Sequence, residues 1–263
     1  MLSLFIFCFI YYLIAGTVIV LGYHRSLTHQ AFKMRKWFEY LVVVLGLPAG
    51  TPIQWVGNHR FHHAHPDVDI DPHSPIIHGL WYAHNGWYIN SKNGLLCFLY
   101  ALAGPIRFLI DAWNRPRTNQ EYNHLAVDIA ANPFYRYISR PSIYGILLLI
   151  HCLIPFTFAY TVWGFSGLIV LWIDLVIIFN LGDSINSLGH EKIDEDTSMV
   201  NHTVLAFFTF GDGYHKDHHK NPGSARLGFQ SKQIDVGWGI LLVLKFFNLV
   251  YDINTLEAQE NPS

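Results

Sequence analysis

The chain has 263 residues, with 19 acidic and 17 basic side chains and a formal net charge of −2. This near-balance gives no support to a nucleic-acid-binding protein. Only 14% of the residues are charged and 51% are hydrophobic, whereas an ordinary soluble domain has about 25% charged residues. The composition excludes a disordered chain and argues against a simple water-soluble globule. The three cysteines form no CxxC pair, which argues against a disulfide framework, a zinc ribbon or a fused iron–sulfur domain.

The first apolar segment, residues 1–23, contains no charged side chain. As a helix it would extend roughly 34 Å, enough to cross a bilayer once. A cleavable signal peptide would begin with basic residues, and none precedes Arg25. We therefore expect a transmembrane helix over residues 1–23.

Two further apolar runs stand together in residues 142–185, and Gly164 and Gly167 bracket the link between them. The pattern predicts a transmembrane hairpin. Asp174 and Asp183 lie in its second arm. Because a carboxylate is costly in lipid, both should face protein or a cavity.

All 17 Lys and Arg residues lie outside residues 1–24 and 141–191. The positive-inside rule then places residues 24–141 and 186–251 in the cytoplasm. The N-terminus and the hairpin turn would lie on the outside. We treat 1–263 as a single domain in which residues 252–263 form a loose tail.

Three shorter apolar stretches cover residues 41–53, 95–110 and 238–251. The first lies between two histidine clusters, and the 29 residues from His29 to His59 are too few for two crossings, which need about 40. We therefore expect the first stretch to lie in the interface or to dip into the membrane and return. We interpret the other two as interfacial helices, with buried helices of a cytosolic cap as the alternative. The predicted fold is all-α: about three transmembrane helices, interfacial helices and a cytosolic helical cap that holds a dimetal site.

Three histidine clusters indicate that site: HRSLTH at 24–29, HRFHH at 59–63 and HKDHH at 215–219. On a helix, positions i, i+3 and i+4 fall within about 100° of one another, so the imidazoles of HxxHH point the same way. The pair His24 and His29 would sit about 140° apart on a regular helix. Either the helix ends there, or the two histidines serve different metals.

A fourth element, NSLGH at 186–190, follows the last crossing and places Asn186 and His190 on one helical face. Nine histidines are too many for one structural zinc, which takes four ligands. Two adjacent metals fit the count better, and open positions beside nitrogen ligands favour a redox metal such as iron.

The sequence resembles the membrane-bound fatty-acid desaturase family, in the stearoyl-CoA desaturase and bacterial acyl-lipid desaturase branch. The motifs that carry the resemblance are GYHRSLTH (22–29), WVGNHRFHH (55–63), DPHSP (71–75), HNGW (84–87), NSLGH (186–190) and GDGYHKDHH (211–219). Their order and spacing fit from about residue 10 to about residue 230.

The resemblance implies a non-haem di-iron enzyme that uses O₂ and two electrons to introduce a cis double bond, Δ9-like, into a saturated acyl chain. The implied catalytic and metal-binding residues are His24, His29, His59, His62, His63, His190, His215, His218 and His219. Asn186 matches a position that binds one metal through a water. Four residues would support the ligands from behind: Asp71, His73, His84 and Asp212.

An unactivated methylene has no acidic proton and no leaving group, so a metal–oxygen oxidant must open it. The protein must hold one C–C bond at a fixed depth. We expect a bent apolar tunnel with aromatic lining, with Trp55, Trp81 and Trp87 as candidates for lining or gating it. Interfacial anchoring is the alternative role for these tryptophans.

Three departures from the family pattern bear on substrate and partners. Members usually have two crossings before the first histidine cluster, and this chain has room for one. CoA-using animal members carry an Arg–Asp pair where this chain has Gly57 and Asn58. This favours an acyl chain on a glycerolipid or carrier protein over CoA. No electron-transfer segment is fused to the chain, so a separate donor is expected, a ferredoxin or a small cytochrome.

Two rival functions are open. A fatty acyl or lipid hydroxylase of the same superfamily would share the ligands and the oxidant. A membrane metal transporter would need ionisable ligands along a transmembrane path, and His151, Asp174 and Asp183 are the candidates there.

Overall fold

The computed structural model describes residues 1–192 and 198–255. Helices dominate these residues. In chain order the elements are α1 (Leu2–Thr17), η1 (Val18–Thr28), β1 (Lys33–Met34), α2 (Lys36–Leu45), η2 (Leu47–Ala49), α3 (Pro52–Ala64), α4 (Pro75–His78), α5 (Leu80–His84), η3 (Gly86–Tyr88), α6 (Gly94–Ala101), α7 (Ile106–Asn114), η4 (Arg115–Arg117), η5 (Gln120–Ala126), α8 (Val127–Ala131), α9 (Pro133–Ile138), α10 (Pro141–Leu188), α11 (Thr203–Phe208), α12 (His215–Lys220), α13 (Val236–Phe246) and β2 (Val250–Tyr251).

Two helices are long and apolar enough to cross a membrane by length and composition. One is the continuous run of α1 and η1, residues Leu2–Thr28, and the other is α10. Inside α10 the backbone of Gly164 departs from helical geometry, with φ 61° and ψ −146°. Only glycine adopts this conformation without strain, so the chain reverses there and α10 consists of two arms, as the predicted hairpin requires.

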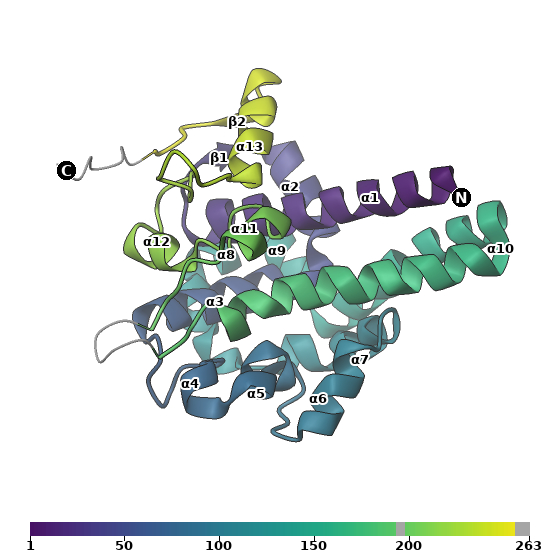
Figure 1. Cartoon of the computed structure of the whole chain (residues 1–263), viewed down its shortest axis with the longest axis horizontal. Coiled ribbons are helices and arrows are strands. Elements are labelled where there is room, and N and C mark those ends of the chain that lie inside the picture. The colour runs from purple at the N-terminus through teal and green to yellow at the C-terminus, as the bar shows by residue number, and fades with distance from the viewer. Residues whose placement is uncertain (193–197, 256–263) are drawn as a thin grey trace.

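The arms of α10 and the helix α1 lie side by side (Figure 1). Phe7 of α1 contacts Phe158 and Trp163, with ring centroids 5.3 and 5.4 Å apart. The indole of Trp163 donates a hydrogen bond to Ser3 Oγ at 3.1 Å. The N-terminus and the turn at Gly164 therefore lie at the same end of the molecule.

The short helices form a body at the opposite end, where the largest buried cluster joins η1, α3, α9 and α10. Tyr23, Val56, Tyr144 and Leu148 are fully buried in it. The helix α3 begins at Pro52, where Thr51 caps it by accepting a hydrogen bond from the amide of Gln54 at 3.2 Å. This packing fixes η1 against α3, the two elements that carry the first two histidine clusters.

A small antiparallel sheet was not expected from the sequence. Lys33 pairs with Tyr251 and Met34 with Val250, and strands of two residues are too short to give an alternating pattern. The start of the expected loose tail is also held in place. Asn254 donates from its amide to the carbonyl of Ala31 and accepts from the amide of Ala225, both at 2.8 Å. Residues 256–263 of that tail lie outside the described residues.

Candidate metal centre

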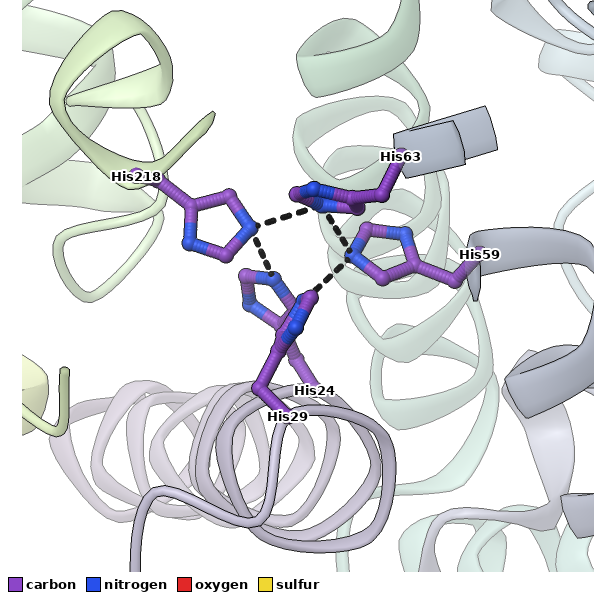
Figure 2. Close-up of side chains that lie close together, drawn as sticks. All are labelled: His24, His29, His59, His63 and His218. Atoms are coloured by element: carbon purple, nitrogen blue, oxygen red, sulfur yellow. Dashed lines mark hydrogen bonds between the residues drawn. The ribbon is translucent and has the colours of Figure 1, made fainter. Parts of the chain in front are cut away.

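The nine predicted histidines come together in two adjacent groups, within each of which the nearest ring nitrogens lie within 4.8 Å of one another. Group A contains His24, His29, His59, His63 and His218. Group B contains His62, His190, His215 and His219. Figure 2 shows the five rings of group A pointing toward one another from three separate elements. The rings of His63 and His219 stack at 4.1 Å between centroids, so the two groups are neighbours.

His24 and His29 belong to the same group because η1 is a π-helix. Its hydrogen bonds run from residue i+5 to residue i, as in the bond from the His29 amide to the His24 carbonyl at 3.2 Å. Such a helix turns less per residue than an α-helix, so residues five apart share a face. The helix also ends there, which confirms the first of the two expectations: η1 ends at Thr28 and His29 is its C-cap, while His24 and His29 both lie in group A.

The two HxxHH helices divide their histidines between the groups in a reciprocal way. In α3, His59 and His63 enter group A while His62 enters group B. In α12, His215 and His219 enter group B while His218 enters group A. Positions i and i+4 therefore serve one group and position i+3 the other, a division that the shared helical face alone does not reveal.

His190 follows the second arm of α10 and completes group B. Its Nε2 lies 2.9 Å from Nε2 of His215. The residue before it must be small, since a Cβ on Gly189 would lie 2.8 Å from the His215 ring and 2.4 Å from the carbonyl oxygen of Ile185. The glycine of NSLGH thus lets α12 approach the end of α10.

Three carboxylates orient the imidazoles from behind. Asp212 lies 2.9 Å from Nδ1 of His24, and Asp71 lies 3.0 Å from Nδ1 of His62. Asp67 lies 2.7 Å from Nδ1 of His190. Because a carboxylate only accepts hydrogen bonds, each of these Nδ1 atoms carries the proton. The corresponding Nε2 atoms then present lone pairs to the group.

Asp67 was missed by the sequence analysis, although it lies in the same segment as Asp71. Three aspartates alternate at 67, 69 and 71, and nothing in that pattern distinguishes the one that faces His190. Burial alone would raise the pKa of Asp67, but the hydrogen bond from His190 and those from the hydroxyls of Ser198 and Ser74 hold that pKa below its ordinary value.

Burial, followed by the neighbouring imidazoles, lowers the pKa of His62, His215 and His218 well below the ordinary value. These rings are therefore neutral at pH 7, the form that binds a metal. Within the groups, Nε2 atoms approach one another closely, for example 2.9 Å for His24 and His218 and 3.0 Å for His29 and His59. Lone pairs that converge at this distance favour a cation between them, so the donor set fits one nitrogen-liganded metal per group.

The remaining predicted residues lie at different distances from the two groups. The ring of His73 lies 4.3 Å from that of His62, between centroids. Asn186 lines the cavity that also reaches His215. His84 instead hydrogen-bonds Ser187 Oγ at 2.9 Å and Asn180 Oδ1 at 3.0 Å. Its two ring nitrogens are thus used in holding α5 to α10 rather than in orienting an imidazole of either group.

A cavity of about 220 Å³ opens beside the two groups, and His24, His59 and His215 form part of its wall. Apolar residues of α1, η1 and the second arm of α10 line part of it: Ile14, Ala15, Val18, Ile178 and Phe179. The lining also includes Trp87, Tyr88, Arg107, Arg115 and Asp183. A long apolar molecule in this cavity would pass directly beside both groups.

Of the three tryptophans predicted to line a tunnel, Trp55 and Trp87 line this cavity. Trp55 stacks on the ring of His59 at 4.9 Å between centroids. Trp81 is instead 39% exposed and packs against Phe98. Gly57 has no room for a side chain, because a Cβ there would lie 2.6 Å from the carbonyl oxygen of Tyr122.

The chain is similar to known proteins over most of its length. The profile described as fatty acid desaturase matches residues 2–227. Delta-9 acyl-lipid desaturase 1 of Arabidopsis thaliana is 34% identical over 255 residues, which cover 93% of this chain and 73% of that protein. The acyl-CoA C20 Delta5-desaturase of Anemone leveillei is 32% identical over 254 residues, 94% of this chain and 72% of that protein. The sn-1 stearoyl-lipid 9-desaturase of Anabaena variabilis is 29% identical over 258 residues, 95% and 84% respectively.

The site and these relatives together define an oxidoreductase. The chain belongs to the fatty acid desaturase family.

Proposed function

We propose that this protein is an O₂-dependent di-iron desaturase that introduces a cis double bond into a saturated fatty acyl chain. The observation that carries the proposal is the convergence of two imidazole groups on one wall of an apolar cavity. Group A and group B would each hold one iron, and Asn186 would contribute to one of them through a water. When bound, the irons supply the oxidation by O₂ that an unactivated methylene requires.

The stoichiometry of the desaturation reaction shows what the protein must provide. The acyl –CH₂–CH₂– unit gives up two hydrogens. With O₂, two electrons and two protons, it yields –CH=CH– and two waters. The chain's own residues hold the acyl chain still beside the groups, exclude bulk water and keep the ligating rings in one tautomer. Asp212, Asp71 and Asp67 serve the last purpose through the Nδ1 protons of three histidines.

We further propose that α1 with η1 and the two arms of α10 cross the bilayer, with both imidazole groups on the cytoplasmic side. The distribution of Lys and Arg supports this orientation. The N-terminus and the turn at Gly164 lie at the same end of the molecule, which is consistent with this orientation. The two electrons would come from a separate donor, a ferredoxin or a small cytochrome. Lys216, Lys220 and Arg226 lie on or just after α12 and are candidates for docking an acidic donor.

The acyl chain would be carried on a glycerolipid, with Δ9-like regiochemistry. The Arabidopsis and Anabaena relatives are named as acyl-lipid or stearoyl-lipid desaturases, while the Anemone relative is named as an acyl-CoA enzyme. The glycine at position 57, enforced by the Tyr122 carbonyl, leaves no side chain there for contact with a CoA carrier.

Expression in a host of known lipid profile tests the function. Mass spectrometry of the lipids should show a new acyl species lighter by two hydrogens, with one double bond at a fixed position. A species heavier by one oxygen would instead identify a hydroxylase. Metal flux in proteoliposomes without any acyl product would identify a transporter.

A further inference from the structure

The helices α6 and α7 form a hairpin whose tip is docked on the second arm of α10. Asn180 Nδ2 donates to the carbonyl of Ala101 at 2.9 Å, and Trp172 Nε1 donates to the carbonyl of Leu102 at 3.2 Å. The approach is close, since a Cβ on Gly104 would lie 2.6 Å from Trp172 Nε1. The carbonyls at the end of α6 are thus satisfied by side chains of α10.

These contacts fix how far the hairpin reaches along α10. Trp172 and Asn180 lie eight and sixteen residues after the turn at Gly164, which corresponds to about 12 and 24 Å along the helix axis. The hydrocarbon core of a bilayer is about 30 Å thick. If the arm crosses the membrane as the proposed function requires, the tip between these two levels lies well inside the hydrocarbon and not at its surface.

The hairpin has one exposed apolar face and one buried face, as expected for a segment at this depth. Leu99, Leu102 and Leu109 point outward and are 54%, 47% and 58% exposed. The opposite face is buried and includes Tyr100 and Phe108. Irregular backbone at membrane depth is tolerated only where protein satisfies its polar groups, and the donors from Trp172 and Asn180 meet that condition at the tip.

An ion pair anchors the hairpin to α10. Arg107 is fully buried, and its Nη1 lies 2.7 Å from Asp183 Oδ2. The guanidinium carbon lies 4.3 Å from the ring centroid of Tyr100 and 4.4 Å from that of Phe179. The charges cancel, and the two aromatic rings shield the cation from lipid, so a charged pair can persist at this depth.

We propose that α6 and α7 form a re-entrant hairpin, which enters the bilayer from the cytoplasmic side, turns at residues 102–105 and returns. This inference rests on the proposed function and replaces the interfacial helix expected over residues 95–110. Since Arg107 and Phe108 also line the cavity, the hairpin forms the wall that separates the acyl chain from bulk lipid on this side. Its outer face fits the hydrocarbon of the membrane.

Single cysteines in a background without the three native ones test the depth. Leu102→Cys places a thiol at the tip, at a residue that is 47% exposed, and Lys92→Cys places one just before α6. In membrane vesicles of either orientation, a membrane-impermeant maleimide should leave Leu102→Cys unlabelled until the membrane is dissolved in denaturing detergent. Lys92→Cys should be labelled from the cytoplasmic face. Labelling of Leu102→Cys from the cytoplasmic face in intact vesicles overturns the proposal.

A fluorophore on the same thiols gives a second readout. Nitroxide-bearing lipids with the quencher deep in the acyl region should quench the fluorophore at position 102 more strongly than the one at position 92. Equal quenching by headgroup-level and deep nitroxides at both positions contradicts the re-entrant hairpin. Iron content and acyl products are measured separately on each variant. A labelled tip in an active enzyme overturns the hairpin alone, whereas an inactive, iron-free parent chain overturns the proposed function.

The anchoring pair provides a matched comparison. Arg107→Ala leaves the Asp183 carboxylate buried and unpaired, so the hairpin should move and Leu102→Cys should become labelled at least severalfold faster. The double variant Arg107→Met with Asp183→Leu replaces both charges by apolar side chains. Replacing a buried ion pair in this way is often neutral or stabilising. Labelling of the tip should then return to the parent level. Unchanged protection in Arg107→Ala would show that the pair is not the anchor.

Discussion

His24 and His29 are brought into group A by a backbone hydrogen bond between them, from the amide of His29 to the carbonyl of His24 at 3.2 Å. The π-helical register of η1 places two histidines that are five residues apart on the same side of the helix. The spacing HxxxxH therefore predicts a shared direction only if the helix is π-helical, and an α-helical geometry would not predict it.

Moving the second histidine by one position tests this register. In Thr28→His with His29→Gln, the two histidines are four residues apart, the spacing that an α-helix places on one face. We expect this double variant to bind less iron than the parent, because Thr28 faces its own helix, with Oγ1 donating to the carbonyl of Tyr23 at 2.8 Å. The measurement is iron per chain in purified protein. Iron at the parent level would mean that η1 readily adopts the α-helical register.

The orienting carboxylates should act on one group each. Asp212→Asn should weaken metal binding to group A, and Asp67→Asn should weaken it at group B, by roughly 10- to 100-fold as is typical for such partners. The amide keeps the volume but removes the charge that favours the Nδ1 proton on His24 or His190. Metal titration should show the loss of one site and retention of the other in each variant.

Asp128→Asn is the control for those variants. This carboxylate pairs with Arg60 at 2.7 Å but is 42% exposed, and pairs of this kind contribute about 0–1 kcal/mol. Both metal sites should titrate as in the parent. If Asp128→Asn weakens metal binding as strongly as Asp212→Asn does, the direct contact to the imidazole is not what matters.

The glycine at position 57 should be indispensable to packing. A Cβ there would lie 2.6 Å from the backbone oxygen of Tyr122, so Gly57→Ala must push α3 away from η5. Overpacking of this kind costs about 1–3 kcal/mol. We expect lower thermal stability in detergent and reduced iron content, because α3 carries three of the nine histidines.

Gly145→Ala in α10 is the matched substitution, since its new methyl would lie 3.8 Å from the Ala112 Cβ, an ordinary contact. An alanine in a helix is favoured over glycine by about 1 kcal/mol. Its stability should equal or exceed that of the parent. Equal destabilisation by the two substitutions would contradict the packing argument.

The sequence predicts the helical fold, the hairpin at Gly164 and the set of nine histidines, because apolar length and imidazole spacing are local signals. It does not predict that the middle histidine of each HxxHH, His62 in α3 and His218 in α12, enters the other group, since that depends on how two helices far apart in sequence cross. The roles of Asp67 and Arg107 are not predicted from the sequence, for the same reason. Their partners, His190 and Asp183, lie 123 and 76 residues away, and no local pattern selects one aspartate or arginine over another.

The orientation in the membrane has its own test. A reporter fused after Ser263 should be active in the cytoplasm, since Lys and Arg are absent from residues 1–24 and 141–191. A second reporter inserted at the turn near Gly164 should report the opposite side. The reverse pattern would place the imidazole groups on the outer face and remove access to a cytoplasmic electron donor.

The metal content of the purified protein decides whether nine imidazoles hold two irons beside an acyl cavity. We expect about two irons per chain, falling well below two in His62→Ala and His219→Ala while the protein still inserts in the membrane. One zinc per chain, or two irons retained in both variants, would rule out the di-iron site.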